Sequence, residues 1–202
     1  MIGPVYVVTD PTAPTPVRDQ AMAAARGGAW AVQIRDKTAS DAELARMTDA
    51  LIETLAPMGV RVFVNDRVEV ARATGADLHI GQDDGDPLRA RDRIAPNALL
   101  GISIDTVAQC ARVPDGIDYI GAGPFRATAT KPDAAAPIGP EGLTRIVAAA
   151  PVPTLAIGGL SIRDIAILKQ AGASGMAVVS AVTRAADPET ATRALVDAWK
   201  QK

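Results

Sequence analysis

Two aspartates, Asp66 and Asp84, are the first candidates for metal chemistry in this sequence. Each follows a β-type run, Arg61–Asn65 for the first and Asp77–Ile80 for the second, and a helical pattern separates the runs. Parallel strands joined by a helix bring their carboxyl ends to one edge of a sheet. The two carboxylates should then be neighbours, as hard divalent cations require. The alternative is a pair of solvated turn residues, because Asp favours loops after strands.

Cations are expected at the same edge. In the segment QIRDK, period-two alternation places Gln33, Arg35 and Lys37 on one side of a strand. Mg²⁺ uses one or two carboxylates together with phosphate oxygens of a substrate, and Arg and Lys neutralise the remaining charge. The residue types therefore predict a magnesium–diphosphate site, although solvated loop charges satisfied by the same aspartates are the alternative. Three further polar residues are expected at this edge, namely Asn65, Ser103 and Lys131.

Backbone amides form a second predicted anion site. Gly158-Gly159 follows one β-type run and Val179-Ser180 ends the next. Exposed N–H groups at these places can hold a phosphate without a cation, although a glycine pair is equally compatible with a tight turn. The long loop GPFRATATKPDAAAPIG, which carries Thr128, Thr130 and Lys131, indicates a lid over the substrate. An ordinary long loop is the alternative.

His79 is the only histidine of the chain and lies between the two aspartates in sequence. We interpret it as a neutral side chain that donates or accepts a hydrogen bond toward a heterocycle. A core histidine bonded to a neighbour is the alternative, since histidine is commonly of intermediate burial.

The elements that must position these residues alternate eight times between β-type runs and helical patterns. This alternation favours a single (β/α)₈ TIM barrel domain over residues 1–202, because a doubly wound sheet usually has fewer strands and no G-x-G-x-x-G motif follows the first run. The predicted strands are 5–9, 31–34, 61–65, 77–80, 99–103, 118–122, 154–157 and 175–179. The predicted helices are 17–26, 41–56, 67–74, 87–94, 106–113, 139–150, 162–170 and 188–200.

Composition narrows the protein class. Of the 202 residues 48% are hydrophobic and only 3% are aromatic, so Val, Ile, Leu and Ala must fill the core. The net charge of −2 gives no reason to expect binding to nucleic acid or to an anionic membrane. The lone cysteine, Cys110, excludes a disulfide. Because the first strand begins within a few residues of Met1, we expect no signal peptide. No apolar run approaches the length of a membrane span, so we expect a cytoplasmic protein with small-molecule partners. The sequence leaves open whether it forms a homo-oligomer.

With these residues in place, the chain resembles the thiamine-phosphate synthases along essentially its whole length. The matching segments are VYVVTD, VQIRDK, VNDR, GADLHIGQDD, LGIS, GPFRATATKPDAAAPIG, AIGG and AVVSA, in the family's order and at its spacing. The resemblance implies a (β/α)₈ barrel that joins hydroxymethylpyrimidine diphosphate to thiazole phosphate, releases diphosphate and requires Mg²⁺. The expected mechanism is dissociative: positive charge on the exocyclic carbon of the pyrimidine is captured by the thiazole nitrogen.

The resemblance also implies residue roles. Asp66 and Asp84 would bind Mg²⁺, while Gln33 and His79 would face the aminopyrimidine. Arg35, Lys37, Ser103 and Lys131 would stabilise the departing diphosphate as the catalytic groups, by positioning and electrostatics alone. The diphosphate would be held by Arg35, Lys37, Asn65, Ser103 and Lys131. The thiazole phosphate would be held by Thr128, Thr130, Gly158, Gly159, Val179 and Ser180.

One position departs from the family pattern. Members often carry a histidine after the LGIS-type strand, where this chain has Asp105. In the related thiazole tautomerases a histidine in that region takes part in proton transfer, so Asp105 argues against a tautomerase. Two alternatives to the synthase are such a tautomerase and a non-catalytic regulator that binds thiazole phosphate or thiamine phosphate. Neither needs a diphosphate–metal site.

Overall fold

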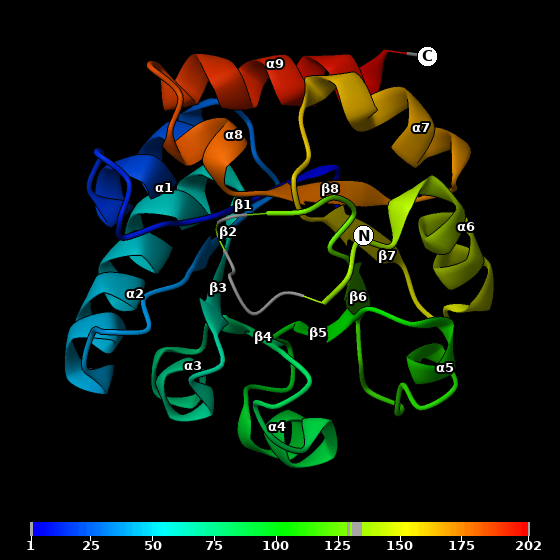
Figure 1. Ribbon diagram of the computed structural model, residues 1–202. Helices are drawn as coiled ribbons and strands as arrows, with labels where there is room; N and C mark the ends of the chain where they lie inside the picture. The colour runs from blue at the N-terminus through cyan, green and yellow to red at the C-terminus, as the bar shows by residue number, and fades with distance from the viewer. Residues whose placement is uncertain (1, 129, 131–134, 202) are drawn as a thin grey trace.

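Eight parallel strands close into one barrel in sequence order. The computed structural model describes residues 2–128, 130 and 135–201. Each strand is hydrogen-bonded to the strand before it, and β1 is also paired with β8. Figure 1 shows the strands at the centre and the helices around them. The strands are β1 (Val5–Val8), β2 (Ala31–Ile34), β3 (Arg61–Asn65), β4 (Asp77–Ile80), β5 (Leu100–Ile104), β6 (Tyr119–Ala122), β7 (Thr154–Ile157) and β8 (Gly175–Val178).

The helices follow the strands and cover the outside of the barrel (Figure 1). The predicted barrel is confirmed, with strand ends within one residue of the predicted ones. None of the helices in the described part of the chain is long and apolar enough to cross a membrane. They are α1 (Val17–Arg26), α2 (Asp41–Leu55), η1 (Ala56–Met58), α3 (Val68–Thr74), α4 (Pro87–Arg93), α5 (Val107–Cys110), α6 (Gly139–Ala149), η2 (Ile162–Asp164), α7 (Ile165–Gln170), α8 (Ser180–Thr183) and α9 (Pro188–Lys200).

Local sequence signals explain the start of α2 and the end of α3. Helix α2 begins with a capping box, in which the Ser40 hydroxyl accepts from the Glu43 N–H at 3.3 Å and the Glu43 carboxylate accepts from the Ser40 N–H at 3.0 Å. Helix α3 ends at Gly75, which adopts the left-handed conformation with φ 73°.

Two helix predictions after the fifth and eighth strands were wrong in part. Helix α5 spans only Val107–Cys110 instead of 106–113, and the chain continues as a turn because Val113 precedes Pro114 and is disfavoured in a helix. After β8 the chain forms the additional one-turn helix α8 before α9, where only one helix, 188–200, was predicted. A short extra helix at this place is a recurrent feature of phosphate-binding barrels.

The inside of the barrel holds most of the few aromatic residues. Tyr6, Phe63 and Tyr119 are buried together, with Trp30 packed against them. Tyr6 and Phe63 have ring centroids 5.0 Å apart, and Phe63 and Tyr119 are perpendicular at 5.8 Å, a favourable edge-to-face arrangement. Gly101 on β5 makes room for this cluster, since a Cβ atom there would lie 2.1 Å from Cζ of Tyr119. The aromatic layer forms a floor beneath the carboxyl ends of the strands, where Tyr6 and Tyr119 border a cavity.

Candidate active site

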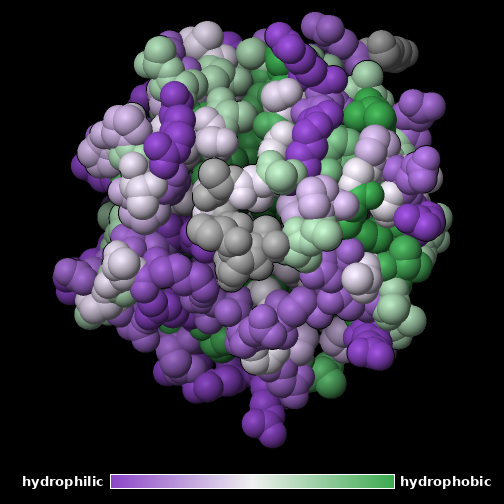
Figure 2. All heavy atoms as spheres, in the orientation of Figure 1, coloured by the Kyte–Doolittle hydropathy of each residue, from purple (hydrophilic) through white to green (hydrophobic). Residues whose placement is uncertain are grey.

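A cavity of about 450 Å³ opens at the carboxyl ends of the strands, above the aromatic floor. The face of the molecule seen in Figure 2 is most hydrophilic over α3 and α4. The cavity collects most of the sequence-predicted residues. They are Gln33, Arg35, Lys37, Asn65, His79, Asp84, Ser103, Thr128, Thr130, Gly158, Gly159, Val179 and Ser180. Asp66 is not among the lining residues, and Lys131 lies outside the described residues.

A chain of hydrogen bonds forms the bottom of this cavity. His79 contacts the Tyr119 hydroxyl through Nδ1 at 2.8 Å and the Ser103 hydroxyl through Nε2 at 3.1 Å. Tyr119 in turn donates to the Tyr6 hydroxyl at 3.3 Å, which also accepts from the Gln33 amide at 2.8 Å. Burial raises the pKa of both tyrosines, so they stay neutral hydroxyls. His79 is therefore bonded to its neighbours, as the alternative interpretation expected, and it also borders the cavity. Its hydrogen bond toward a heterocycle stays a prediction.

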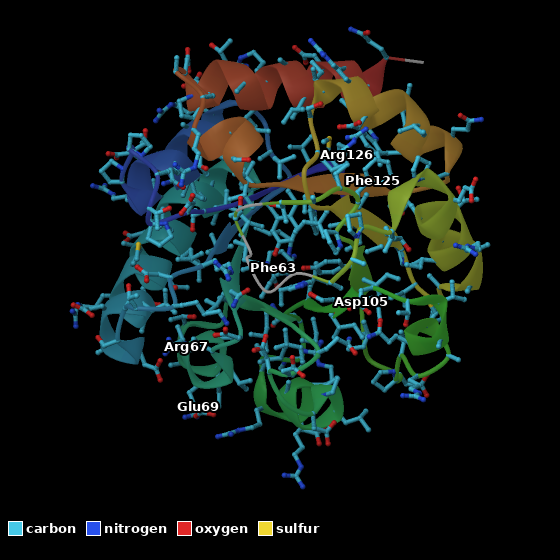
Figure 3. All side chains as sticks on the ribbon, viewed as in Figure 1. Phe63, Arg67, Glu69, Asp105, Phe125 and Arg126 are labelled. Carbon is cyan, nitrogen blue, oxygen red and sulfur yellow. The ribbon has the colours of Figure 1, made fainter. Side chains whose placement is uncertain are left out.

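Asp66 occupies a constrained position at the end of β3. Its φ of 54° is the only positive value outside glycine among the described residues, and its N–H donates to the carbonyl of His79 at 2.9 Å, which joins it to the end of β4. Its carboxylate pairs with Lys37 and lies 3.2 Å from Nε of Arg67. Figure 3 labels Arg67 beside α3. Two cations therefore neutralise this carboxylate.

Asp84 approaches the same rim from the loop after β4. Its Oδ2 accepts from the N–H of Gly81 at 2.6 Å, and the residue borders the cavity. Within the described ranges, no three His, Cys, Asp or Glu side chains gather as a metal site. Asp66 and Asp84 offer carboxylate oxygens, the donor type that a hard cation prefers.

The glycine pair after β7 has a steric cause. The loop after β6 begins by running along the end of β7: the Phe125 N–H donates to the carbonyl of Ile157 at 2.7 Å and the Arg126 N–H to that of Gly158 at 3.0 Å. A Cβ at Gly158 would lie 2.6 Å from Cα of Pro124, and the φ values of Gly158 and Gly159 are 102° and 64°. Only glycine fits this close approach. Gly158 and Gly159 therefore form a tight turn that is also part of the cavity wall.

Asp105, the residue that departs from the family pattern, borders the cavity after β5. Figure 3 labels it close to the barrel opening. Its backbone N–H donates to Oε1 of Gln109 at 2.8 Å, which fixes the start of α5. The structure therefore places a carboxylate, and no imidazole, at this part of the wall.

Two ion pairs next to the cavity had no sequence prediction. Arg126 binds the buried Asp164 at 2.5 Å, and in Figure 3 it projects toward α7. Arg184 binds Asp10 at 2.9 Å across 174 residues of sequence. Burial would raise the pKa of Asp10, but hydrogen bonds from Thr12 and the nearby Arg184 hold it below its ordinary value. Residues this far apart in the sequence cannot be recognised as an ion pair from their spacing.

Comparison with known proteins identifies relatives over the whole chain. The family model described as thiamine monophosphate synthase matches residues 5–182. A thiamine-phosphate synthase of Roseiflexus castenholzii is 44% identical over 99% of this chain and 90% of its own length. One of Xanthobacter autotrophicus is 44% identical over 94% of this chain and 92% of its own.

Solved structures agree with this relationship. The thiamine phosphate pyrophosphorylase of Pyrococcus furiosus superposes with a TM-score of 0.88 at 33% identity, covering 98% of this chain and 95% of that one. A 3-hexulose-6-phosphate synthase superposes with a TM-score of 0.72 at 20% identity, over 96% of this chain and 99% of its own. At that identity the likeness concerns the fold alone.

Proposed function

This chain belongs to the thiamine monophosphate synthase family, and from that premise we propose that it joins hydroxymethylpyrimidine diphosphate to thiazole phosphate with release of diphosphate. One observation carries the proposal at the level of the site. A single cavity has Arg35, Lys37 and Asp84 on its wall together with the glycine turn after β7 and the Val179-Ser180 backbone. Two anionic substrates can therefore be held with their reacting ends in one cavity.

The diphosphate half of the proposed site is the rim formed by β2, β3 and β4. Arg35 and Lys37 would bind the phosphate oxygens, with Asn65 and Ser103 as hydrogen-bonding partners. Asp66 and Asp84 would hold Mg²⁺, which would supply positive charge to the departing diphosphate. Lys37 contacts Asp66, so its ammonium group lies where it can pair with either the carboxylate or a bound diphosphate.

The pyrimidine would lie on the hydrogen-bonded floor. Gln33 and His79 border the cavity and are held from below by Tyr6 and Tyr119. Because both tyrosines stay neutral, the floor offers hydrogen bonds to the aminopyrimidine without adding negative charge beside its diphosphate. Ser103, which contacts His79 at 3.1 Å, links the floor to the diphosphate rim.

The proposed reaction breaks the bond between the exocyclic carbon and the diphosphate oxygen before the new bond forms. The electron-rich pyrimidine supports the resulting positive charge, and the ring nitrogen of the thiazole then forms the carbon–nitrogen bond. The side chains hold the two substrates in line and stabilise the charge on the leaving group. No side chain needs to form a covalent bond to either substrate.

The direct test is a diphosphate-release assay. Purified protein with both substrates and Mg²⁺ is expected to release one diphosphate for each thiamine phosphate formed, and omission of the thiazole phosphate is expected to stop product formation. Excess EDTA should abolish the activity, and added Mg²⁺ should restore it. Full activity in EDTA would refute the metal assignment, and tautomerisation of the thiazole without diphosphate release would refute the synthase.

Lys131 is assigned to the diphosphate from the sequence alone, and this assignment can be tested by kinetics. If it binds the diphosphate, Lys131→Ala should lower kcat by on the order of a hundredfold while the affinity for thiazole phosphate changes little. Steady-state rates and equilibrium binding of thiazole phosphate measure the two effects separately. Weak thiazole phosphate binding with a nearly normal kcat would assign Lys131 to the monophosphate instead.

A further inference from the structure

The monophosphate end of the cavity rests on a very short helix. Val179 and Ser180 border the cavity, and Ser180 begins α8, a helix of four residues that ends at Thr183. Val182 and Thr183, the last two residues of α8, are fully buried. A single helical turn has little stability of its own. The position of the Val179-Ser180 backbone therefore depends on what holds α8 at its other end.

Arg184, the residue directly after α8, makes that attachment. Its Nη2 donates to Oδ2 of Asp10 at 2.9 Å and to the Thr12 hydroxyl at 2.8 Å. Asp10 and Thr12 belong to the loop after β1, so the contacts join the two ends of the chain where β1 pairs with β8 and the barrel closes. The N–H of Arg184 meanwhile donates to the carbonyl of Ser180 at 3.2 Å, which couples the guanidinium to the turn.

Asp10 is a well-fixed acceptor for Arg184. Only 6% of the residue is exposed, and its Oδ1 accepts from both the N–H of Thr12 at 2.9 Å and the Thr12 hydroxyl at 2.7 Å. Its backbone is clamped by the fully buried Gln20, which accepts from the Asp10 N–H at 2.9 Å and donates to the Asp10 carbonyl at 2.7 Å. A guanidinium bound to this carboxylate is therefore tied to the rigid body of the barrel.

Asp10 also borders the cavity itself. A carboxylate in that wall without a paired cation would repel a nearby phosphate, and the low exposure of Asp10 weakens screening by water. Arg184 supplies the compensating charge. Arg184 thus favours anion binding at Val179-Ser180 in two ways: it fixes the α8 turn, and it neutralises the Asp10 carboxylate.

We propose that Asp10 and Arg184 are positioning residues that set the affinity of the site for the monophosphate of the thiazole substrate. The inference rests on the proposed function, which assigns that phosphate to the Val179-Ser180 backbone. Neither residue needs to touch the substrate. Their effect is expected to be confined to the thiazole substrate, since the diphosphate rim lies on β2, β3 and β4.

The test compares Arg184→Gln with a matched control, Arg193→Gln. Arg193 on α9 is similarly exposed, at 53% against 49%, and forms an ion pair with Glu189 away from the cavity. Arg184→Gln is expected to raise both the Kd and the KM for thiazole phosphate about tenfold, the loss expected for a charge-assisted hydrogen bond. In Arg184→Gln the KM for pyrimidine diphosphate should remain within about twofold of the wild-type value. In the control variant both KM values and the Kd for thiazole phosphate should do so as well. Arg184→Lys should recover part of the thiazole phosphate affinity.

Two readouts separate this inference from the proposed reaction. Equilibrium binding of thiazole phosphate alone requires no turnover, and the melting temperature reports on the fold. An unchanged Kd in Arg184→Gln, or equal rises in both KM values together with a lower Tm, would overturn the positioning role even in an active synthase. If the affinity for thiazole phosphate falls in Arg184→Gln but the wild type releases no diphosphate, only the synthase reaction would be refuted.

Discussion

Diphosphate release is expected to fall by on the order of a hundredfold in Asp66→Asn and in Asp84→Asn, because each substitution removes a carboxylate charge from the proposed metal site. Asparagine keeps the size of the side chain, so the change tests charge more than shape. In Asp66→Asn the loss also leaves Lys37 and Arg67 without their shared partner. Steady-state assays over a range of Mg²⁺ concentrations measure both kcat and the apparent affinity for the metal.

The matched control is Asp92→Asn on the outer helix α4, where the aspartate is exposed and away from the cavity. It should retain wild-type activity. If the Asp66 and Asp84 variants are weakened in metal binding, a higher Mg²⁺ concentration should restore part of their rate. Variants that work at wild-type rate at every Mg²⁺ concentration would show that these aspartates are ordinary turn residues.

The largest expected effect on stability comes from Gly101→Ala, at about 3 kcal/mol of the free energy of unfolding, as for overpacking in a tightly packed core. The added Cβ would lie 2.1 Å from Cζ and 2.5 Å from the hydroxyl of Tyr119. That ring is fully buried against Phe63 and Tyr6, so it has little room to move. A displaced Tyr119 would also disturb its contact with His79, and pyrimidine affinity should fall with stability.

Denaturant unfolding measures the loss of unfolding free energy in Gly101→Ala, and a double-mutant cycle identifies the cause of that loss. If the clash with the ring is responsible, Gly101→Ala combined with Tyr119→Leu should cost less than the sum of the two single variants. Strictly additive losses would show that the alanine acts on the backbone of β5 and not on Tyr119. The cycle requires only folded protein and no substrate.

Much of the fold followed from local patterns in the sequence. The alternating β-type and helical runs were sufficient to predict the barrel, and the Ser40–Glu43 capping box marked the start of α2. Local signals were less informative where a segment was short. Helix α8 has a single turn and no recognisable cap, and its position depends on Arg184 and Asp10, which are distant in sequence.

The sequence by itself determined which residues gather at the rim, because parallel strands joined by helices bring all their carboxyl ends to one side. Gln33, Arg35 and Lys37 therefore line the cavity as the alternation predicted. Only the tertiary structure decided which partners they meet. The hydrogen-bonded floor joins Gln33 to His79 through two tyrosines on other strands, since packing inside the barrel sets those contacts. The Asp10–Arg184 pair likewise exists only because the barrel closes.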